Sequence, residues 1–356
     1  VAEDDGEQIV EIVGDAAGEL PHGLHLLRLT KLRLARAKPL LGALALGDLA
    51  AQIGVQGRVL ERDGNLRDEN LQDREPRLSE GGGAQMVAVC SGATLPRADR
   101  TKFYLLRSFG GKAHEIWDVT TPEKPSRITV VVDGLRDTHK SFWECDTGIG
   151  YLVSGDPAWR AQRMTKIYDL SNPASPVFIR DYGIFGQQPG STGPVPTDLH
   201  GPISLGPKGN RVYFAHGTGR GGIVQIVDRE KLLNGPKEPT EENLLHPQVG
   251  RLDMSPLTGA HTTFPVLGMP IAEFAKDKVG KVRNFVVVTN EQIKNECLEP
   301  RQFVWLVDVT VERFPAPVST WWVPEASGNF CSRGGRFGTH ASNENFTEIY
   351  YRRLMF

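Results

Sequence analysis

The first 85 residues contain no aromatic residue, no cysteine and no methionine. The whole chain has 356 residues with 15 Phe, 6 Trp and 7 Tyr, and every one of these aromatic residues lies at or after Phe103. A segment without large apolar side chains can bury little surface and builds only a small hydrophobic core. The two parts of the chain therefore differ in kind, and we predict a boundary near residue 85.

Several other features are missing from the whole sequence. No run of about 18 uncharged apolar residues is present, so no membrane-spanning helix is predicted. The 41 Lys and Arg nearly balance the 43 Asp and Glu, and a net charge of -2 argues against a broad basic face for nucleic acid. The four cysteines form no CxxC pair, which argues against a zinc finger, and neither a P-loop nor a GxSxG elbow is present.

Residues 1–85 have only weak structural signals. Leucines recur at roughly helical spacing between Leu20 and Leu44, and Pro39 interrupts the pattern. Residues 54–82 are polar, charged and without periodicity. The basic and apolar stretch around Pro39 lies too far from Val1 for a convincing signal peptide. We therefore predict a leader over 1–85 that is helical or poorly ordered, followed by one domain over 86–356.

From Met86 onward, short runs of β-branched and aromatic residues alternate with turns rich in Gly, Pro, Asn and Asp. Four of these runs end in an aliphatic residue, any residue and an aspartate, at residues 116–118, 167–169, 226–228 and 306–308. Three of the four continue into a proline turn, where the Asp side chain bonds nearby backbone N–H groups. Four strands in each unit of 50 to 80 residues predict an all-β fold, a β-propeller of four-stranded antiparallel blades.

The repeat resembles that of a known family. The segments IWDVTTPEKP (116–125), IYDLSNPASP (167–176) and IVDREK (226–231) are similar to the repeat of the LVIVD-repeat family of bacterial β-propellers, and the likeness extends from about Thr101 to Phe356. The resemblance implies the propeller fold and slightly favours a periplasmic or secreted location. The last blade departs from the family pattern, because the sequence stops at Phe356 within what should be its second strand. An open blade edge of this kind predicts a leader that closes the ring, a truncated protein or a homo-oligomer.

Histidines recur in phase with the repeat. His139, His200 and His261 each precede one of the Asp-ending strands, at equal intervals of 61 residues, and His340 begins a fifth unit. Because the first strand of every propeller blade lines the central channel, we expect these four imidazoles to face one another. Imidazole is a common metal ligand and general base. The alternative reading, in which they are structural histidines bonded to carbonyls of a neighbouring blade, remains open.

Oxygen donors lie close to three of these histidines in the sequence: after His139, before His200 (Asp198) and after His340. Mixed carboxylate and amide oxygens favour Ca²⁺, whereas a site made mainly of histidines suits Zn²⁺ or Cu²⁺. We therefore predict a divalent metal, with Ca²⁺ favoured. The expected catalytic residues are His139, His200 and His261, and the expected metal ligands are His340, Glu144, Glu344 and Asn343.

The favoured function is hydrolysis of a small lactone or ester in the central channel. The metal would polarise the carbonyl, and a histidine would take a proton from the attacking water. This hypothesis rests on analogy with propeller lactonases. Two alternatives stay open: a non-catalytic propeller that binds a partner, and a copper redox protein, since selenium-binding-type propellers also use histidines.

The remaining signals are weaker. Cys297 and Cys331 lie in neighbouring units and either form a disulfide or remain as buried thiols. Cys145 lies between two acidic residues, which would raise the pKa of its thiol and disfavour a nucleophilic role. Residues 217–222 match GxGxxG, but strands flank the motif on both sides, so it predicts a hairpin loop and not a dinucleotide site.

Overall fold

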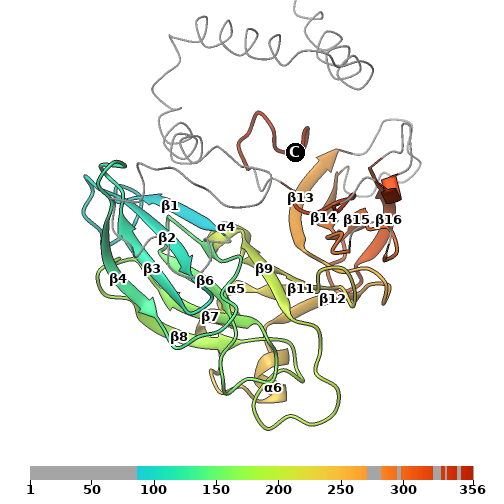
Figure 1. Ribbon diagram of the computed structural model, residues 1–356, viewed down its shortest axis with the longest axis horizontal. Helices are drawn as coiled ribbons and strands as arrows, with labels where there is room; N and C mark the ends of the chain where they lie inside the picture. Colours follow the sequence, from blue (N-terminus) through green and yellow to red (C-terminus); the bar gives the residue numbers. More distant parts are fainter. Residues whose placement is uncertain are drawn as a thin grey trace, which may run out of the picture. The chain divides into compact units, whose positions relative to one another are not determined.

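The computed structural model describes residues 86–270, 282–294, 298–323, 330–332, 335–342 and 346–355. The predicted leader therefore lies outside the described residues. In the described part the strands form four antiparallel sheets of four strands each, and in every sheet the strands are neighbours in the order of the chain (Figure 1). The predicted all-β fold, a propeller of four-stranded antiparallel blades, is confirmed for these residues.

We number the sheets as blades 1 to 4, which comprise β1–β4, β5–β8, β9–β12 and β13–β16. The strands are β1 Val87–Ser91, β2 Phe103–Phe109, β3 Ala113–Asp118, β4 Ser126–Val132, β5 Phe142–Trp143, β6 Ile149–Ser154, β7 Met164–Asp169, β8 Val177–Tyr182, β9 Leu199–Ser204, β10 Arg211–His216, β11 Ile223–Asp228, β12 Gln248–Asp253, β13 Thr262–Pro270, β14 Val282–Thr289, β15 Val304–Asp308 and β16 Ala316–Trp321. The described part also contains short helices: α4 Gly206–Gly209, α5 Arg229–Asn234, α6 Glu241–Leu245 and the 3₁₀ helix η2 Phe330–Ser332.

Burial follows the position of each strand within its blade. The middle strands of blades 2 and 3 are buried along almost their whole length, as in β6 and β10, whereas the outermost strand β16 of blade 4 is exposed at every residue. Middle strands of a propeller blade are covered on both faces by neighbouring blades, so a continuous apolar run is favoured there. This explains why the sequence shows apolar runs such as RVYFA instead of a strict alternation.

The hydrophobic core consists of layers between successive blades. Between blades 2 and 3, for example, the rings of Tyr182 and Phe214 lie with centroids 5.5 Å apart. The first strands also meet: β1 contacts β5, β5 contacts β9, and β9 contacts β13. Because of this arrangement, side chains at the start of these first strands come together although they are far apart in the sequence.

The aspartates that end the third strands make the turns predicted from the sequence. Asp118, Asp169 and Asp308 each accept a hydrogen bond, through Oδ1, from the backbone N–H two residues later, at 3.0, 2.8 and 2.8 Å. Asp228 instead caps α5 by accepting from the N–H of Lys231 at 3.0 Å. The side chain therefore ends the strand at the same place in each of the four blades.

The structure corrects the sequence expectation for Cys145, which was treated as a thiol. Cys90, at the end of blade 1's first strand, is joined to Cys145, which follows β5 in blade 2. The argument about the thiol pKa of Cys145 therefore does not apply, because its sulfur is not a titratable thiol. Cys331 is also disulfide-bonded, whereas Cys297, its expected partner, lies outside the described residues.

The residues after blade 4 contain no strand in the ranges 335–342 and 346–355. The prediction of a second strand near the C-terminus is wrong for residues 346–355, because these residues form turns along most of their length. The hydroxyl of Tyr351 donates to the carbonyl oxygen of Pro265 at 3.1 Å and accepts from the N–H of Leu267 at 2.9 Å. This segment is therefore held against β13 by a side chain and not by a strand ladder.

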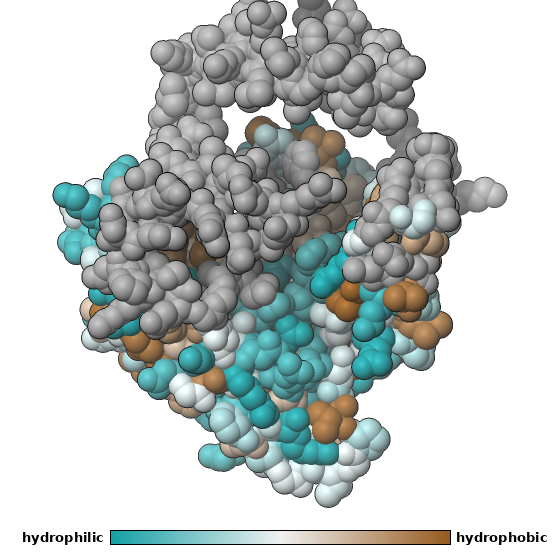
Figure 2. Space-filling view, in the orientation of Figure 1, coloured by the Kyte–Doolittle hydropathy of each residue, from teal (hydrophilic) through white to brown (hydrophobic). Residues whose placement is uncertain are grey.

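The surface is mostly polar in the view of Figure 2, where hydrophilic residues cover the middle of the face and hydrophobic residues form separate patches. Among the exposed apolar residues of blade 4 are Phe314, Val318 and Trp321. In the part of the chain that the structure describes, no helix has the length and apolar character that crossing a membrane requires.

Candidate metal centre

The four histidines that recur with the repeat lie together. The Nε2 atoms of His139 and His200 are 2.9 Å apart. The rings of His200 and His261 have centroids 3.6 Å apart, and those of His261 and His340 are 4.9 Å apart. The prediction that these four residues face one another is therefore confirmed in its geometry.

Backbone hydrogen bonds explain how residues from different blades reach one place. The N–H of His139 donates to the carbonyl of Val153 at the end of β6, and the N–H of His261 donates to that of Thr289 at the end of β14. His200 lies within β9 itself, where the pairing with β10 is irregular. Each of these histidines thus stands at the inner end of its blade, where neighbouring first strands meet.

A carboxylate, Glu291, completes the cluster. It follows β14, is 7% exposed, and places Oε2 3.9 Å from Nε2 of His200 and Oε1 3.5 Å from Nε2 of His340. Arg336 holds the same Oε1 through Nη1 at 2.7 Å. The N–H of Gln292 donates to the carbonyl of Thr339 at 2.8 Å, so the backbone next to Glu291 is tied to the segment that carries His340.

Three of the imidazoles are neutral at pH 7. Burial lowers the pKa of His139 to about 4, with smaller contributions from the positive charges of Arg163 and Lys140. Burial likewise lowers the pKa of His200 and of His261 well below the ordinary value. A neutral imidazole keeps a nitrogen lone pair, which is the form that binds a metal ion.

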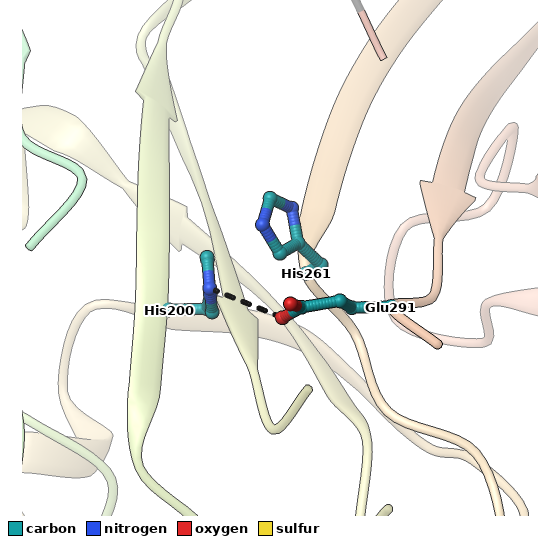
Figure 3. Close-up of side chains that lie close together, drawn as sticks. All are labelled: His200, His261 and Glu291. Carbon is teal, nitrogen blue, oxygen red and sulfur yellow. Dashed lines mark ion pairs between the residues drawn. The ribbon is translucent and has the colours of Figure 1, made fainter. Parts of the chain in front are cut away.

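Donor atoms of His200, His261 and Glu291 all lie within 4.8 Å of one another. Figure 3 shows the three side chains, with Glu291 pointing toward His200 and the ring of His261 above them. All three are at least nine-tenths buried. Two imidazoles and one carboxylate form a donor set that suits a transition metal and leaves further coordination positions open.

The ring of His261 is oriented by neighbours outside this donor set. Its Nδ1 lies 2.9 Å from Oγ1 of Thr262, and Nζ of Lys140 donates to the same oxygen at 3.1 Å. With Nδ1 engaged in this way, Nε2 is the nitrogen available to a ligand. Gly201 makes room for the lysine, because a Cβ at that position would come within 2.7 Å of Cδ of Lys140.

A pocket of about 880 Å³ opens onto the cluster. All four histidines, Glu291, Arg336 and Lys140 line it, together with apolar residues of the first strand of blade 1 and Phe142. The pocket is therefore large enough for a small organic molecule and combines a few polar groups with apolar walls.

Two of the predicted ligands, Asn343 and Glu344, lie outside the described residues. Glu144, the third oxygen ligand expected from the sequence, does not line this pocket. Its Oε2 pairs with Nη2 of Arg229 at 2.6 Å, and its Oε1 accepts from the hydroxyls of Tyr151 and Ser204. The assignment of Glu144 to the metal site is thus corrected: its oxygens are occupied by a bonding network between blades 2 and 3.

Sequence reasoning missed Glu291, the carboxylate that does belong to the cluster. It comes from the loop after the second strand of blade 4, and the corresponding loops begin with Gly155-Asp156 in blade 2 and Gly217-Thr218 in blade 3. Asp156 is bound to Lys166 at 2.6 Å and is not part of the cluster. Because the loops after the second strands of the other blades contribute no acidic ligand, the repeat pattern does not predict that Glu291 belongs to the cluster.

Comparisons with known proteins do not identify a family. No family model matches the chain, and no curated protein matches it. Hydrazine synthase of Kuenenia stuttgartiensis matches with a TM-score of 0.38 and 12% identity, covering 72% of this chain and 53% of that one. An exo-β-1,3-galactanase of Phanerochaete chrysosporium, solved with β-1,3-galactotriose, matches with a TM-score of 0.33 and 9% identity, covering 65% and 49%.

The chain thus spans about half the length of these two structures. Neither likeness carries an argument about function. The LVIVD-repeat resemblance stays a prediction from the repeat residues.

Proposed function

We propose that His200, His261 and Glu291 hold a divalent transition metal and that the centre hydrolyses a small ester or lactone. The observation that carries the proposal is the convergence of three buried donor groups, from blades 3 and 4, within 4.8 Å. Two neutral imidazoles and a carboxylate offer two nitrogen lone pairs and one charged oxygen ligand to a metal ion.

The donor set favours Zn²⁺ or Cu²⁺ over the Ca²⁺ expected from the sequence. Calcium takes six to eight oxygen ligands, and Glu291 is the one carboxylate among the described residues that line the pocket. Imidazole nitrogen suits zinc and copper. We therefore propose a transition metal and give up the preference for calcium.

The pocket residues have roles that fit ester hydrolysis. The metal would act as a Lewis acid on the carbonyl oxygen of the substrate. His139, whose Nε2 faces His200 and whose lowered pKa keeps it neutral, would accept a proton from water. Arg336 and His340 contact Glu291 and fix its orientation. The apolar residues of blade 1 would pack against the substrate and exclude water.

A copper redox centre is the second candidate, and the number of imidazoles favours it. His139, His200, His261 and His340 all line the pocket. Imidazole nitrogen is a ligand that suits Cu²⁺.

The first experiment measures metal content. Purified protein is stripped with a chelator, incubated with Zn²⁺, Cu²⁺ or Ca²⁺, desalted and analysed by elemental analysis. We expect about one zinc or copper per chain and no retained calcium. Glu291→Gln should weaken metal affinity by at least about tenfold, since it removes a charged ligand. The matched control Glu312→Gln, at a half-buried pair with Arg211, should bind metal like the wild type.

The second experiment separates the two functions. Zinc-loaded protein is assayed with p-nitrophenyl acetate and with a γ-lactone, and copper-loaded protein is examined by visible absorbance and electron paramagnetic resonance. Zinc-dependent turnover that Glu291→Gln abolishes supports hydrolysis. A copper spectrum that changes on reduction, without ester turnover, supports the redox candidate. Wild-type protein that retains no metal, or Glu291→Gln with unaltered metal content, would contradict both.

A further inference from the structure

A second pocket, of about 710 Å³, lies between loops of blades 2 and 3. Three arginines line it: Arg160 and Arg163 from the loop between β6 and β7, and Arg220 from the loop between β10 and β11. That second loop contains the glycine-rich segment 217–222, which is a hairpin loop as predicted. The hydrolytic proposal uses none of these arginines.

Among the described residues, no carboxylate pairs with Arg160 or Arg220. Arg160 donates to the carbonyl oxygens of Gly186 at 2.8 Å and Gly193 at 2.6 Å, which fix its position but carry no net charge. Arg220 is exposed and has no carboxylate partner among the described residues. A cation oriented by backbone carbonyls is prepared to bind an anion, because little side-chain entropy remains to be lost.

The acidic groups nearby are already engaged. Asp198 lines the pocket, and its Oδ1 accepts from the backbone N–H groups of Gln162 at 2.7 Å and Arg163 at 3.3 Å. Asp137 pairs with Nε of Arg163 at 3.3 Å and accepts from Nε2 of Gln162 at 2.8 Å. The lining thus has three cationic side chains and one carboxylate, with Asp137 balancing Arg163 in part.

We propose that this pocket binds a small anion through phosphate or carboxylate oxygens. Guanidinium groups bind both kinds of oxyanion, with charge-assisted and often paired hydrogen bonds. Thr218 and the glycine-rich backbone around it border the same space and can add uncharged donors. The anion site is separate from the metal ligands, so it does not depend on the proposed hydrolytic function.

Two contacts relate this pocket to the histidine cluster. The backbone N–H of Glu291 donates to the carbonyl of Thr218 at 3.3 Å, so the glycine-rich loop also supports the carboxylate of the metal centre. Asp198, which binds the backbone of the arginine loop, lies two residues before His200 in the chain. An anion held here would therefore lie next to the elements that position the cluster.

The test measures anion binding to full-length protein freed of metal by chelation. Isothermal titration calorimetry is performed with inorganic phosphate and, in a separate arm, with succinate, both at constant ionic strength set by sodium chloride. Saturable binding of phosphate alone assigns a phosphate-bearing ligand, and binding of succinate alone assigns a carboxylate. If both bind, the site recognises oxyanions in general. If neither binds saturably, the proposal is overturned.

Variants test whether the arginines carry the binding. Arg220→Gln should weaken the affinity by about tenfold, because it removes a charge-assisted hydrogen bond. Asp137→Asn should tighten it, because Arg163 loses its competing carboxylate. Asp137 has a φ of 48°, a conformation that asparagine adopts readily, so this variant should fold. Arg251→Gln, at a half-buried arginine paired with Asp253, is the matched control and should bind like the wild type. Equal affinities for Arg220→Gln, Asp137→Asn and the control would also overturn the proposal.

Discussion

Buried imidazoles in this protein are kept neutral by their surroundings. His114 in β3 is fully buried, and its Nε2 lies 3.2 Å from the carbonyl oxygen of Val153. Burial lowers the pKa of His114 to about 4, and the hydrogen bond to the carbonyl opposes this only in part. The unfolded chain takes up a proton near pH 6.5, where the native protein does not. Native stability contributed by the neutral ring is therefore complete above pH 6.5 and decreases as the pH falls toward 4.

His114→Gln tests this linkage without deleting the side-chain donor. The free energy of unfolding of the wild type should fall between pH 7.5 and pH 5, with about 2 kcal/mol of the loss due to His114. The free energy of unfolding of the variant should fall by about 2 kcal/mol less than that of the wild type over the same pH range. Urea denaturation at the two pH values measures the difference, and His246→Gln, at an exposed histidine, serves as the control. If His114→Gln shows the same pH dependence as the wild type, the neutral buried state of His114 is disproved.

At the scale of elements, buried polar networks join adjacent blades. Glu144 follows β5 in blade 2, and its carboxylate binds the guanidinium of Arg229, in α5 of blade 3, through both oxygens at 2.8 and 2.6 Å. Both side chains are at most 10% exposed. Removing one member of a buried pair leaves the other charge without a partner, so the pair holds the loop and the helix in register.

Glu144→Gln separates this structural role from the metal role expected from the sequence. The variant should lose about 3–5 kcal/mol of unfolding free energy, the range for a broken buried pair. Its metal content, measured at a temperature at which the variant is folded, should equal that of the wild type. Asp253→Asn, at an exposed aspartate that pairs with the half-buried Arg251, should cost less than about 1 kcal/mol. Loss of metal by folded Glu144→Gln protein would restore this residue to the metal site.

At the scale of the whole molecule, the first strands of the blades meet, and one covalent bond crosses between them. The disulfide of Cys90 and Cys145 links blade 1 to blade 2 over a sequence separation of 55 residues. Cys90 is 1% exposed and lies in the apolar layer between these blades. A cross-link over a loop of this length restricts the unfolded chain and so favours the folded state.

Replacing both cysteines, as Cys90→Ala with Cys145→Ala, should lower the free energy of unfolding by about 2–4 kcal/mol. Guanidinium denaturation under non-reducing conditions measures this loss. Reduction of the wild type with a phosphine should lower its midpoint at least as far as the double substitution does. A thiol assay on denatured, unreduced wild-type protein that detects all four cysteines would show that the disulfide does not form.

The local part of this structure could be predicted from the sequence. Strand ends followed from Asp118, Asp169 and Asp308, because an Asx turn is made within three residues and needs no distant partner. The convergence of His200 with His261 also followed, since equal spacing in a repeat places equivalent residues at equivalent points of successive blades. Local turn formation and equal spacing in the repeat were together enough to predict the blades and the histidine cluster.

What remained depended on contacts between blades that no repeat encodes. Glu291 joins the histidines from a loop whose counterparts in other blades have different residues. Glu144, which the sequence placed at the metal site, pairs instead with Arg229. Cys90 forms a disulfide with Cys145. Four cysteines allow three different pairings, and the number of cysteines alone does not show which one forms. The sequence by itself determined the blades and the ring of imidazoles, because both follow from local turns and a period. The carboxylate, the disulfide and the arginine pocket were decided by tertiary structure alone, because they depend on how loops of neighbouring blades pack.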